Sequence, residues 1–414
     1  MAINKEQNKL NVPHLRFPEF HGEWEKCKVS DLLDFYSTNS LSWDQLEYGT
    51  DNLLNLHYGL IHVGLPTMVD LSKDILPAIK KENEPKNFEL CKEGDIAFAD
   101  ASEDTNEVAK AIEFYTLEDK AVVCGLHTIH GRDKSNKTVV GYKGYAFSST
   151  AFHHQIRRIA QGTKIYSINA KNFAECYIGI PSKEEQTKIA KLLRLIDERI
   201  ATQSKLIEDL KKLKSAIIDY AINSLDTDFA KFGSLYEMAG EGGTPTTSNA
   251  SFYDNGKIPF VKIDDLKKKY LTENNDFITE LGLQKSSAWL VPTRSILFSN
   301  GATIGEITIT TYPVCTKQGI LGIVPKPNID VEFLYYFMSS SYFKKAVSRI
   351  VTEGTMKTVY LKDINNIRCP IPTKEKQLDI AKMPSALNSK IDFEQSILKL
   401  FGSQKQYLLR QMFM

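Results

Sequence analysis

The chain has 414 residues, of which 42% are hydrophobic and 25% charged, which excludes the collagen-like, disordered and disulfide-scaffold classes. Its 52 Lys and Arg residues against 51 Asp and Glu residues give a formal net charge of +1, so any DNA binding must depend on local basic patches. The absence of an apolar run of about 20 residues, of a secretory signal and of any CxxC pair among six cysteines favours a cytoplasmic chain with reduced thiols and no membrane partner.

The first part of the chain reads as short β-rich runs separated by polar turns. Strands are predicted at residues 95–99 and 121–124, and a short helix at residues 152–159. The segment 151–171 contains four basic residues and no acidic one. It therefore forms a local basic patch in a chain that is neutral as a whole.

A long helix is predicted next, because no Gly or Pro interrupts residues 183–222. Ser182 is expected to cap this helix, with Glu185 as its capping-box partner three positions on. Apolar residues recur at three- and four-residue steps, which is typical of a two-helix seam. The expected seam residues are Ile189, Leu192, Ile196, Leu206, Leu210, Leu213 and Ile217.

The pattern then repeats. Strands are predicted at residues 295–298, 306–310 and 319–324, followed by helical sequence at 331–349. A second long helix is expected to run to the C-terminus. Pro384 is expected to kink or delay it, and Gly402 lies in its middle. Its expected seam residues are Ile380, Leu387 and Ile391.

The repetition reflects a tandem duplication. Residues 180–200 and 371–391 share nine of 21 positions without gaps, at a spacing of 191 residues, and both begin with the pattern IP-x-KE-x-Q. One long helix with a single apolar stripe needs a partner, and the second copy provides it. We therefore expect an α+β fold with two globular domains separated by an antiparallel pair of long helices, related by a pseudo-two-fold axis.

A search for catalytic motifs is negative. The sequence contains no G-x-x-x-x-G-K-[ST] loop, no Asn- or Asp-Pro-Pro-Tyr methyltransferase loop, no G-x-S-x-G elbow and no H-E-x-x-H helix. The adjacent pair His153 and His154 diverges on a helix, and His127 with His130 lacks obvious Cys or carboxylate ligands, so structural roles are favoured over metal binding. The sequence predicts no catalytic residue and no metal site.

A Gly-Thr turn followed by a lysine occurs in the basic stretch of both copies. Glycine lets a backbone approach a ligand closely, threonine offers a hydroxyl group and lysine neutralises phosphate, although a solvated basic face beside a tight turn is the alternative interpretation. The candidate DNA-binding residues are Arg157, Arg158, Gly162, Thr163, Lys164 and Tyr166 in the first copy and Gly354, Thr355, Lys357 and Thr358 in the second, with Thr244, Thr246 and Lys317 as weaker candidates.

These features together resemble the specificity subunits of Type I restriction-modification systems. The resemblance rests on VPHLRFPEFHGEW at residues 12–24, the Gly-Thr turns, both IP-x-KE-x-Q helix starts and the Gly-Gly-Thr-Pro turn at 242–245. It covers essentially the whole chain. The first copy departs from it in having Tyr-Ser-Thr-Asn at 36–39, where the second has the Gly-Gly-Thr-Pro turn.

The resemblance implies a non-catalytic subunit that recognises double-stranded DNA through two domains, each reading one half of a split site. It implies target-recognition domains at 1–180 and 225–371, and spacer helices at 181–224 and 372–414 that also dock two methyltransferase subunits. Restriction and motor subunits complete the complex, which has endonuclease and adenine methyltransferase activity. S-adenosylmethionine, ATP and magnesium belong to those partners, and no cofactor is expected in this chain.

Two other functions remain open at this level. A self-contained magnesium-dependent nuclease is disfavoured because no cluster of acidic residues recurs in both globules. The other is a coiled-coil scaffold with two protein-binding domains and no role in DNA binding. Cleavage by the purified chain alone would support the nuclease, and failure to bind DNA with methyltransferase subunits present would support the scaffold.

Overall fold

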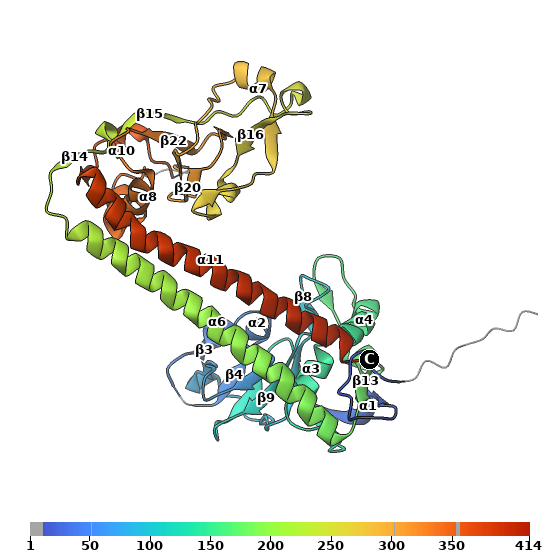
Figure 1. Cartoon of the computed structure of the whole chain (residues 1–414). Coiled ribbons are helices and arrows are strands. Elements are labelled where there is room, and N and C mark those ends of the chain that lie inside the picture. The colour runs from blue at the N-terminus through green and yellow to red at the C-terminus, as the bar shows by residue number, and fades with distance from the viewer. Residues whose placement is uncertain (1–10, 51, 302, 353–356) are drawn as a thin grey trace, which may run out of the picture. The chain divides into compact units, whose positions relative to one another are not determined.

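The computed structural model describes residues 11–50, 52–301, 303–352 and 357–414. The chain forms two compact units (Figure 1). Unit 1 consists of Met1–Ser204 with Ile397–Met414, and unit 2 consists of Lys205–Ser396. Both long helices, α6 (Lys183–Asn223) and α11 (Lys374–Gln411), therefore contribute one part to each unit.

Two sheets form the centre of unit 1. The first is five-stranded, in the order β2 (Leu33–Tyr36), β11 (Thr128–Asp133), β7 (Ile96–Ala99), β9 (Ala111–Thr116) and β5 (Met68–Asp70). The second is four-stranded, in the order β10 (Val122–Cys124), β4 (Leu54–Leu56), β6 (Ala78–Ile79) and β3 (Leu46–Glu47). In the five-stranded sheet all neighbours are antiparallel except the last pair, β9 with β5.

Unit 2 repeats this topology. Its five-stranded sheet has the order β15 (Tyr236–Glu241), β22 (Ile320–Pro325), β19 (Ile296–Ser299), β20 (Ile307–Thr310) and β17 (Tyr270–Leu271), again with only the last pair parallel. Its second sheet is β18 (Asp276–Ile278), β16 (Ile258–Val261) and β21 (Cys315–Thr316). The parallel pair β16–β21 matches β4–β10. The shared order and direction confirm the α+β fold and the tandem duplication.

In each unit a two-stranded ribbon leads into the long helix. The ribbon is β1 (Glu25–Lys28) with β13 (Tyr177–Ile180) in unit 1 and β14 (Phe229–Lys231) with β23 (Arg368–Pro370) in unit 2. Short helices cover the sheets: α1 (Val29–Leu32), α2 (Tyr58–His62), α3 (Lys143–Phe147), α4 (Thr150–Ile159) and α5 (Ala170–Ala174) in unit 1, and α7 (Glu280–Gln284), α8 (Val331–Ser339), α9 (Ser341–Ser348) and α10 (Leu361–Ile364) in unit 2.

The predicted local elements are present. All five predicted strands occur as β7, β10, β19, β20 and β22, and the helix predicted at 152–159 is α4. The helical sequence at 331–349 forms two helices rather than one. Ser340 has an extended backbone (ψ 156°), and its hydroxyl group accepts a hydrogen bond from the Phe343 backbone, so it ends α8 and caps α9.

The glutamine of each IP-x-KE-x-Q segment fixes the start of its long helix. The Gln186 side chain donates hydrogen bonds to the carbonyl groups of Pro181 and Lys137 and accepts one from the Val139 backbone, each at 2.9 Å. In unit 2 Gln377 makes the same three bonds with residues exactly one repeat later, Pro372, Asn328 and Asp330. Both side chains are buried.

The capping prediction is half correct. Ser182 accepts a hydrogen bond from the Glu185 backbone at 3.3 Å, as an N-cap does. The Glu185 side chain, however, does not complete a capping box. It is buried in a bidentate ion pair with Arg16, with two N···O distances of 2.7 Å, because a charged fork is a stronger partner for a carboxylate than one backbone N–H.

The predicted seam is correct at the ends of α6 and wrong in its middle. Ile189, Ile196, Ile380 and Ile391 are buried, and Leu192, Leu210, Ile217 and Leu387 are half-buried. Leu206 and Leu213 are 40% and 48% exposed, whereas Ile207 and Ile218 are buried. The buried residues Ile196, Ile207 and Ile218 follow one another in steps of 11 residues. Because 11 residues make slightly more than three turns of an α-helix, these side chains lie on nearly the same face.

Within each unit α6 and α11 share an equivalent polar contact. In unit 1 Lys405 of α11 pairs with Asp197 of α6 at 2.6 Å. In unit 2 Lys214 of α6 donates to Asn388 of α11 at 2.9 Å. Lys214 and Asn388 are the counterparts, 191 residues away, of Lys405 and Asp197. Because Asn388 provides no charge, burial lowers the pKa of Lys214.

Pro384 does not delay the second helix. α11 begins at Lys374, ten residues before the proline, and continues through both Pro384 and Gly402 to Gln411. Pro384 is buried. Among the described residues, no helix combines the length and apolar character needed to cross a bilayer.

Candidate nucleic-acid interface

In unit 1 the basic stretch forms an exposed helix end followed by a hairpin. Ser149 caps α4, whose last turn presents Arg157 and Arg158 to solvent. Gln161 and Ser167 then exchange two backbone hydrogen bonds, of 2.9 and 2.8 Å, which close the loop 162–166. The hairpin is attached to the rest of the unit by β12 (Tyr166–Ser167), which pairs with β8 (Ala101–Ser102) (Figure 1).

The loop requires glycine at its first position. Gly162 has a φ of +136°, and a Cβ atom there would lie 1.9 Å from the carbonyl oxygen of Ile165. The tight turn therefore pushes Thr163 and Lys164 outward, where both are exposed, while Tyr166 is half-buried against the unit core. The structure thus brings Arg157, Arg158, Thr163 and Lys164 to one solvent-facing segment.

In unit 2 the corresponding pair of residues is also joined by hydrogen bonds, one repeat later. Thr352 and Thr358 are exactly 191 residues beyond Gln161 and Ser167. The Thr352 backbone donates to the Thr358 carbonyl group at 3.1 Å, and the Thr352 hydroxyl group accepts a bond from the Thr358 backbone. Lys357 is exposed and Thr358 is half-buried. The other two candidates in this copy, Gly354 and Thr355, lie outside the described residues.

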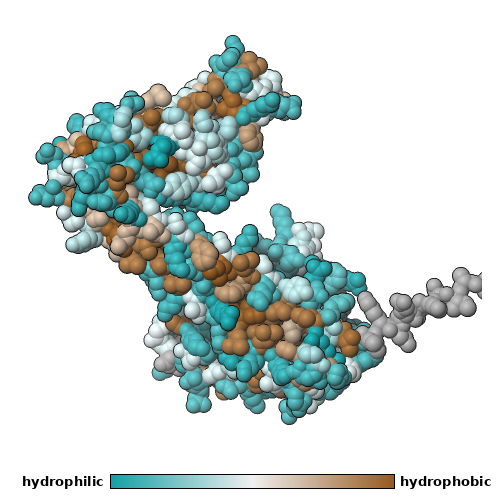
Figure 2. Space-filling view, viewed as in Figure 1, coloured by the Kyte–Doolittle hydropathy of each residue, from teal (hydrophilic) through white to brown (hydrophobic). Residues whose placement is uncertain are grey.

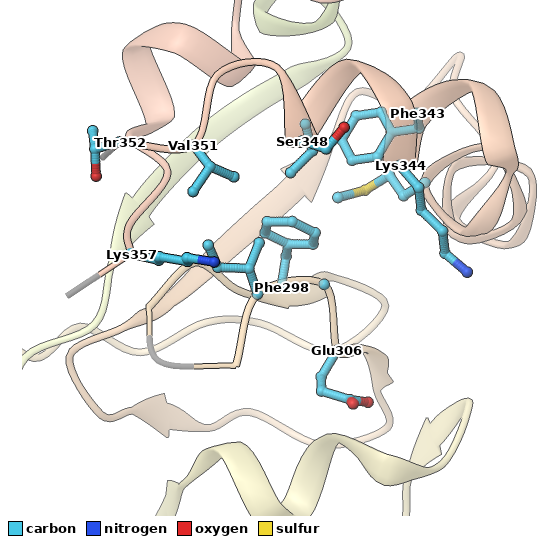
Figure 3. A pocket seen from close by; sticks show the side chains of 12 residues that line it. Phe298, Glu306, Phe343, Lys344, Ser348, Val351, Thr352 and Lys357 are labelled. Atoms are coloured by element: carbon cyan, nitrogen blue, oxygen red, sulfur yellow. The ribbon is translucent and has the colours of Figure 1, made fainter. Parts of the chain in front are cut away.

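A partly apolar cavity of about 590 Å³ lies beside this hairpin (Figure 3). Phe298 and Phe343 line its interior, and Lys344 of α9 and Lys357 of the hairpin lie on its rim. Lys344, Lys345 and Arg349 are all exposed. Unit 2 therefore carries cations on both sides of a concave surface, at the fold position where unit 1 carries Arg157, Arg158 and Lys164.

The Gly-Gly-Thr-Pro turn is chiefly a packing feature. A Cβ atom on Gly242 would lie 2.2 Å from the Thr316 carbonyl oxygen, and one on Gly243 would lie 2.3 Å from the Ser287 hydroxyl oxygen. The Thr244 hydroxyl group accepts a hydrogen bond from the Gln318 backbone at 3.3 Å, which places Thr244 beside Lys317. Thr246 and Lys317 are exposed. Their contact with DNA stays a prediction.

The histidine pairs are placed differently from each other. His154 is exposed and hydrogen-bonds to Arg157 at 3.1 Å, while desolvation lowers the pKa of His153. His127 contacts Asp100 at 3.2 Å near the surface. His130 is fully buried and lies close to Asp95, Cys91 and Cys124. The expectation that His130 has no Cys or carboxylate neighbour is therefore wrong, because these residues come from segments distant in sequence.

The long helices keep large apolar side chains exposed in both units. In unit 1 these are Leu195, Leu400 and Tyr407, and in unit 2 they include Leu206, Leu213, Met383 and Phe393. Figure 2 shows hydrophobic side chains gathered along these helices. Large apolar groups concentrated in this way are typical of protein–protein contact surfaces.

Comparisons with known proteins agree with this architecture. The family model for the Type I restriction modification DNA specificity domain matches twice, at residues 68–212 and 226–400. The chain is 25% identical over 253 residues to the type I restriction enzyme MjaIX specificity subunit of Methanocaldococcus jannaschii, and 23% identical over 227 residues to the EcoR124I/EcoR124II specificity subunit of Escherichia coli. These alignments cover 56% and 51% of this chain, and 58% and 55% of the relatives.

A solved structure shares the fold along nearly the whole chain. The S subunit of the Type I restriction-modification system from M. genitalium superposes with a TM-score of 0.55 at 17% identity, covering 97% of this chain and 99% of that one. Two DNA specificity domains on a duplicated α+β chain favour a DNA-recognition protein over a scaffold. The chain belongs to the family of Type I restriction-modification specificity subunits.

Proposed function

We propose that this chain reads a bipartite DNA sequence for a Type I restriction-modification complex, with each unit reading one half of the site. The observation that carries the proposal is the repeated hairpin. It closes at the same place in both copies, beside a helix that ends in exposed cations. Lysine and arginine on such a segment neutralise phosphates and set the position of the unit, while neighbouring polar side chains read base edges.

The long helices serve as the spacer and as the docking surface in this proposal. Their exposed Leu, Met, Phe and Tyr side chains fit a contact with two methyltransferase subunits. Because the formal net charge of the chain is only +1, the partners complete the enclosure of the DNA. Restriction and motor subunits join the same complex.

The chemistry belongs to those partners. Adenine methylation requires S-adenosylmethionine, and translocation and cleavage require ATP and magnesium, all of which we assign to the methyltransferase and motor subunits. The contribution of this chain is selection of the DNA site. Methylome sequencing of cells with and without the chain is expected to show one bipartite methylated motif that disappears with it.

The DNA contact is tested by substitution in the assembled complex. Lys164→Ala and Lys357→Ala are each expected to weaken binding to all sequences and to reduce the slope of log K against log salt concentration by about one unit, because each removes one phosphate contact. Binding is measured by fluorescence anisotropy over a range of salt concentrations, on duplexes with and without the methylated motif.

The matched controls are Lys73→Ala in unit 1 and Lys268→Ala in unit 2. Both lysines are exposed and paired with acidic neighbours, Asp70 and Glu273, and neither lies on a hairpin. Their removal is expected to leave the salt slope unchanged. An unchanged slope in both hairpin variants would remove Lys164 and Lys357 from the DNA interface.

A further inference from the structure

Three groups able to bind a metal ion meet in the interior of unit 1. Cys91 precedes β7, Cys124 is the last residue of β10, and His130 lies within β11. One ligand atom from each residue lies within 4.8 Å of the other two, and the two sulfur atoms are 3.6 Å apart. All three side chains are buried, with exposed fractions of 6%, 2% and 0%.

The histidine ring is held with one nitrogen available. Its Nε2 atom is 2.8 Å from Oδ2 of Asp95. Because a carboxylate only accepts hydrogen bonds, Nε2 carries a proton, and Nδ1 is the ring nitrogen left to bind a ligand. Among the described residues, buried Nδ1 has no hydrogen-bond partner. A buried ring nitrogen without a partner is costly unless it binds something.

Asp95 is itself fixed by several donors. Arg132 donates from Nε to Oδ1 at 2.9 Å and from Nη2 to Oδ2 at 2.8 Å, and the Lys92 backbone donates to Oδ2 at 2.9 Å. Arg132 also stacks on Tyr36, 4.5 Å from the ring centre. A carboxylate that accepts the second ring N–H is the outer-shell partner that orients histidine ligands in metal sites and sets their tautomer, and Arg132 holds this carboxylate in place.

We propose that Cys91, Cys124 and His130 bind one zinc ion in unit 1, with Asp95 as the positioning residue. A set of two thiolates and an imidazole binds zinc in preference to hard cations. Two sulfur ligands on a tetrahedral zinc ion, each with a bond of about 2.3 Å, lie about 3.8 Å apart, close to the observed 3.6 Å. Each thiol loses its proton to solvent when the metal binds.

The site joins the two sheets of unit 1. Cys124 belongs to the four-stranded sheet and His130 to the five-stranded one, while Cys91 lies in the segment that leads into β7. A zinc ion there would connect three segments behind the hairpin and stabilise the recognition unit. The three ligand side chains are buried, and a tetrahedral zinc ion would take its fourth ligand from outside this set.

Unit 2 provides an internal control because it has only part of this set. Cys315, at the repeat position of Cys124, is buried beside Phe260 and Ile278. In unit 1 His130 of β11 pairs with Ala97 of β7, and in unit 2 Gly322 of β22 pairs with Leu297 of β19. Unit 2 therefore has Gly322 at the strand position of His130. The metal site is thus a feature of the first copy, and Cys315 is a buried cysteine outside it.

The test uses the full chain purified under reducing conditions. Elemental analysis of the native protein is expected to find one zinc ion per chain, absent from Cys91→Ser and Cys124→Ser and retained in Cys315→Ser. Reconstitution of metal-free native protein with cobalt is expected to give the near-ultraviolet thiolate-to-cobalt band and the strong visible bands of a tetrahedral site. Asp95→Asn is expected to weaken cobalt binding by about 10- to 100-fold.

Cobalt binding to the native chain keeps the proposal testable if the cysteine variants fail to fold. The absence of both zinc and a thiolate–cobalt band in the native protein would overturn it. A Cys91–Cys124 disulfide in protein that contains no metal would also overturn it, in favour of a redox role for the thiol pair. An unchanged cobalt spectrum in Cys91→Ser would exclude the assigned ligands.

Discussion

Gln186 and Gln377 show how much one side chain can determine in this fold. Each side-chain amide donates two hydrogen bonds and accepts one, all with backbone groups. These groups belong to the helix start and to a loop about 45 to 50 residues earlier. Burial makes these bonds valuable, because a backbone group left without a partner there has no water to replace it. The two glutamines therefore fix each long helix to its own globule.

Gln186→Leu and Gln377→Leu are expected to destabilise the chain by about 2–3 kcal/mol each, because each leaves buried backbone groups unpaired while the side-chain volume is similar. Equilibrium denaturation in urea, followed by circular dichroism, measures the loss. Glu184→Gln, an exposed change in the same helical turn, is expected to cost less than about 0.5 kcal/mol. Equal stability of the leucine variants and this control would contradict the role assigned to the glutamines.

The sequence revealed the motif but not its chemistry. The repeated IP-x-KE-x-Q segments were sufficient to detect the duplication, since identity at fixed spacing needs no structure. The partners of Gln186, however, include Lys137 and Val139, which no local pattern connects to it. The same holds for Cys91, Cys124 and His130, because strand pairing between distant segments brings them together.

At the scale of the elements, the pairing of α6 with α11 combines apolar packing with an equivalent polar contact in each unit. Asp197 forms an ion pair with Lys405 at 2.6 Å and accepts a hydrogen bond from the Tyr145 hydroxyl group at 2.8 Å. Asn388 holds the equivalent place in unit 2 with no charge of its own. The duplicated contact therefore differs in strength between the copies, since hydrogen bonds between charged groups are stronger.

Asp197→Asn is expected to destabilise the chain by about 1–2 kcal/mol, because Lys405 loses its carboxylate partner in a site where both side chains are only 18% exposed. Thermal and urea unfolding measure the change. Glu198→Gln is the matched control, since its pair with Arg194 is a solvent-exposed contact within one helix and contributes little. A similar effect of both substitutions would show that the contact between the helices contributes no more than a surface pair.

Gly402 offers a stabilising change within α11. It lies in a helix, its φ is not positive, and a Cβ atom there would meet nothing within 4 Å. Gly402→Ala is therefore expected to stabilise the chain by about 0.5–1 kcal/mol, as measured by urea denaturation. The matched control is Gly22→Ala, where a Cβ atom also has free space but φ is +80°. This substitution is expected to destabilise the chain because the conformation disfavours alanine.

Which apolar residues of α6 are buried in the helix seam is not predictable from the sequence pattern. Leu206 and Leu213 fit a seven-residue repeat, yet Ile207 and Ile218 are the buried residues. Both series are apolar, and the sequence alone does not tell which one faces the partner helix and which one stays exposed for another subunit. Only the packing of α11 against α6 within each unit decides between them.

At the scale of the whole molecule, the duplication gives a single chain two recognition units of one topology and different surfaces. The hairpin of unit 1 carries Thr163 and Lys164, and that of unit 2 carries Lys357, beside helices with different cations. A homodimer would bind two identical half-sites, whereas a duplicated chain is free to bind two different ones. The fold class and this division were predictable from the repeat, but the bases read by each surface were not, because loop geometry rather than a motif sets groove contacts.

The proposed role of the long helices as a spacer predicts the effect of shortening them. Removal of four residues from each helix, near Ser204 in α6 and near Ser396 in α11, where each helix passes from one unit to the other, shortens each helix by about 6 Å at 1.5 Å per residue. With base pairs about 3.4 Å apart, the spacer of the recognised motif is expected to shorten by one to two base pairs. Methylome sequencing of cells carrying the shortened chain measures the new spacing.

Both half-sites are expected to persist unchanged in this variant, because the deletions leave the hairpins and the sheets of each unit intact. That outcome separates the spacer role from a general effect on folding, which would remove methylation at every site. Recognition of the original spacing by a folded, shortened chain would show that contacts outside the helices set the distance between the half-sites. The helices would then act only as the docking surface for the methyltransferase subunits, and their exposed Leu206 and Leu213 would be the residues to substitute next.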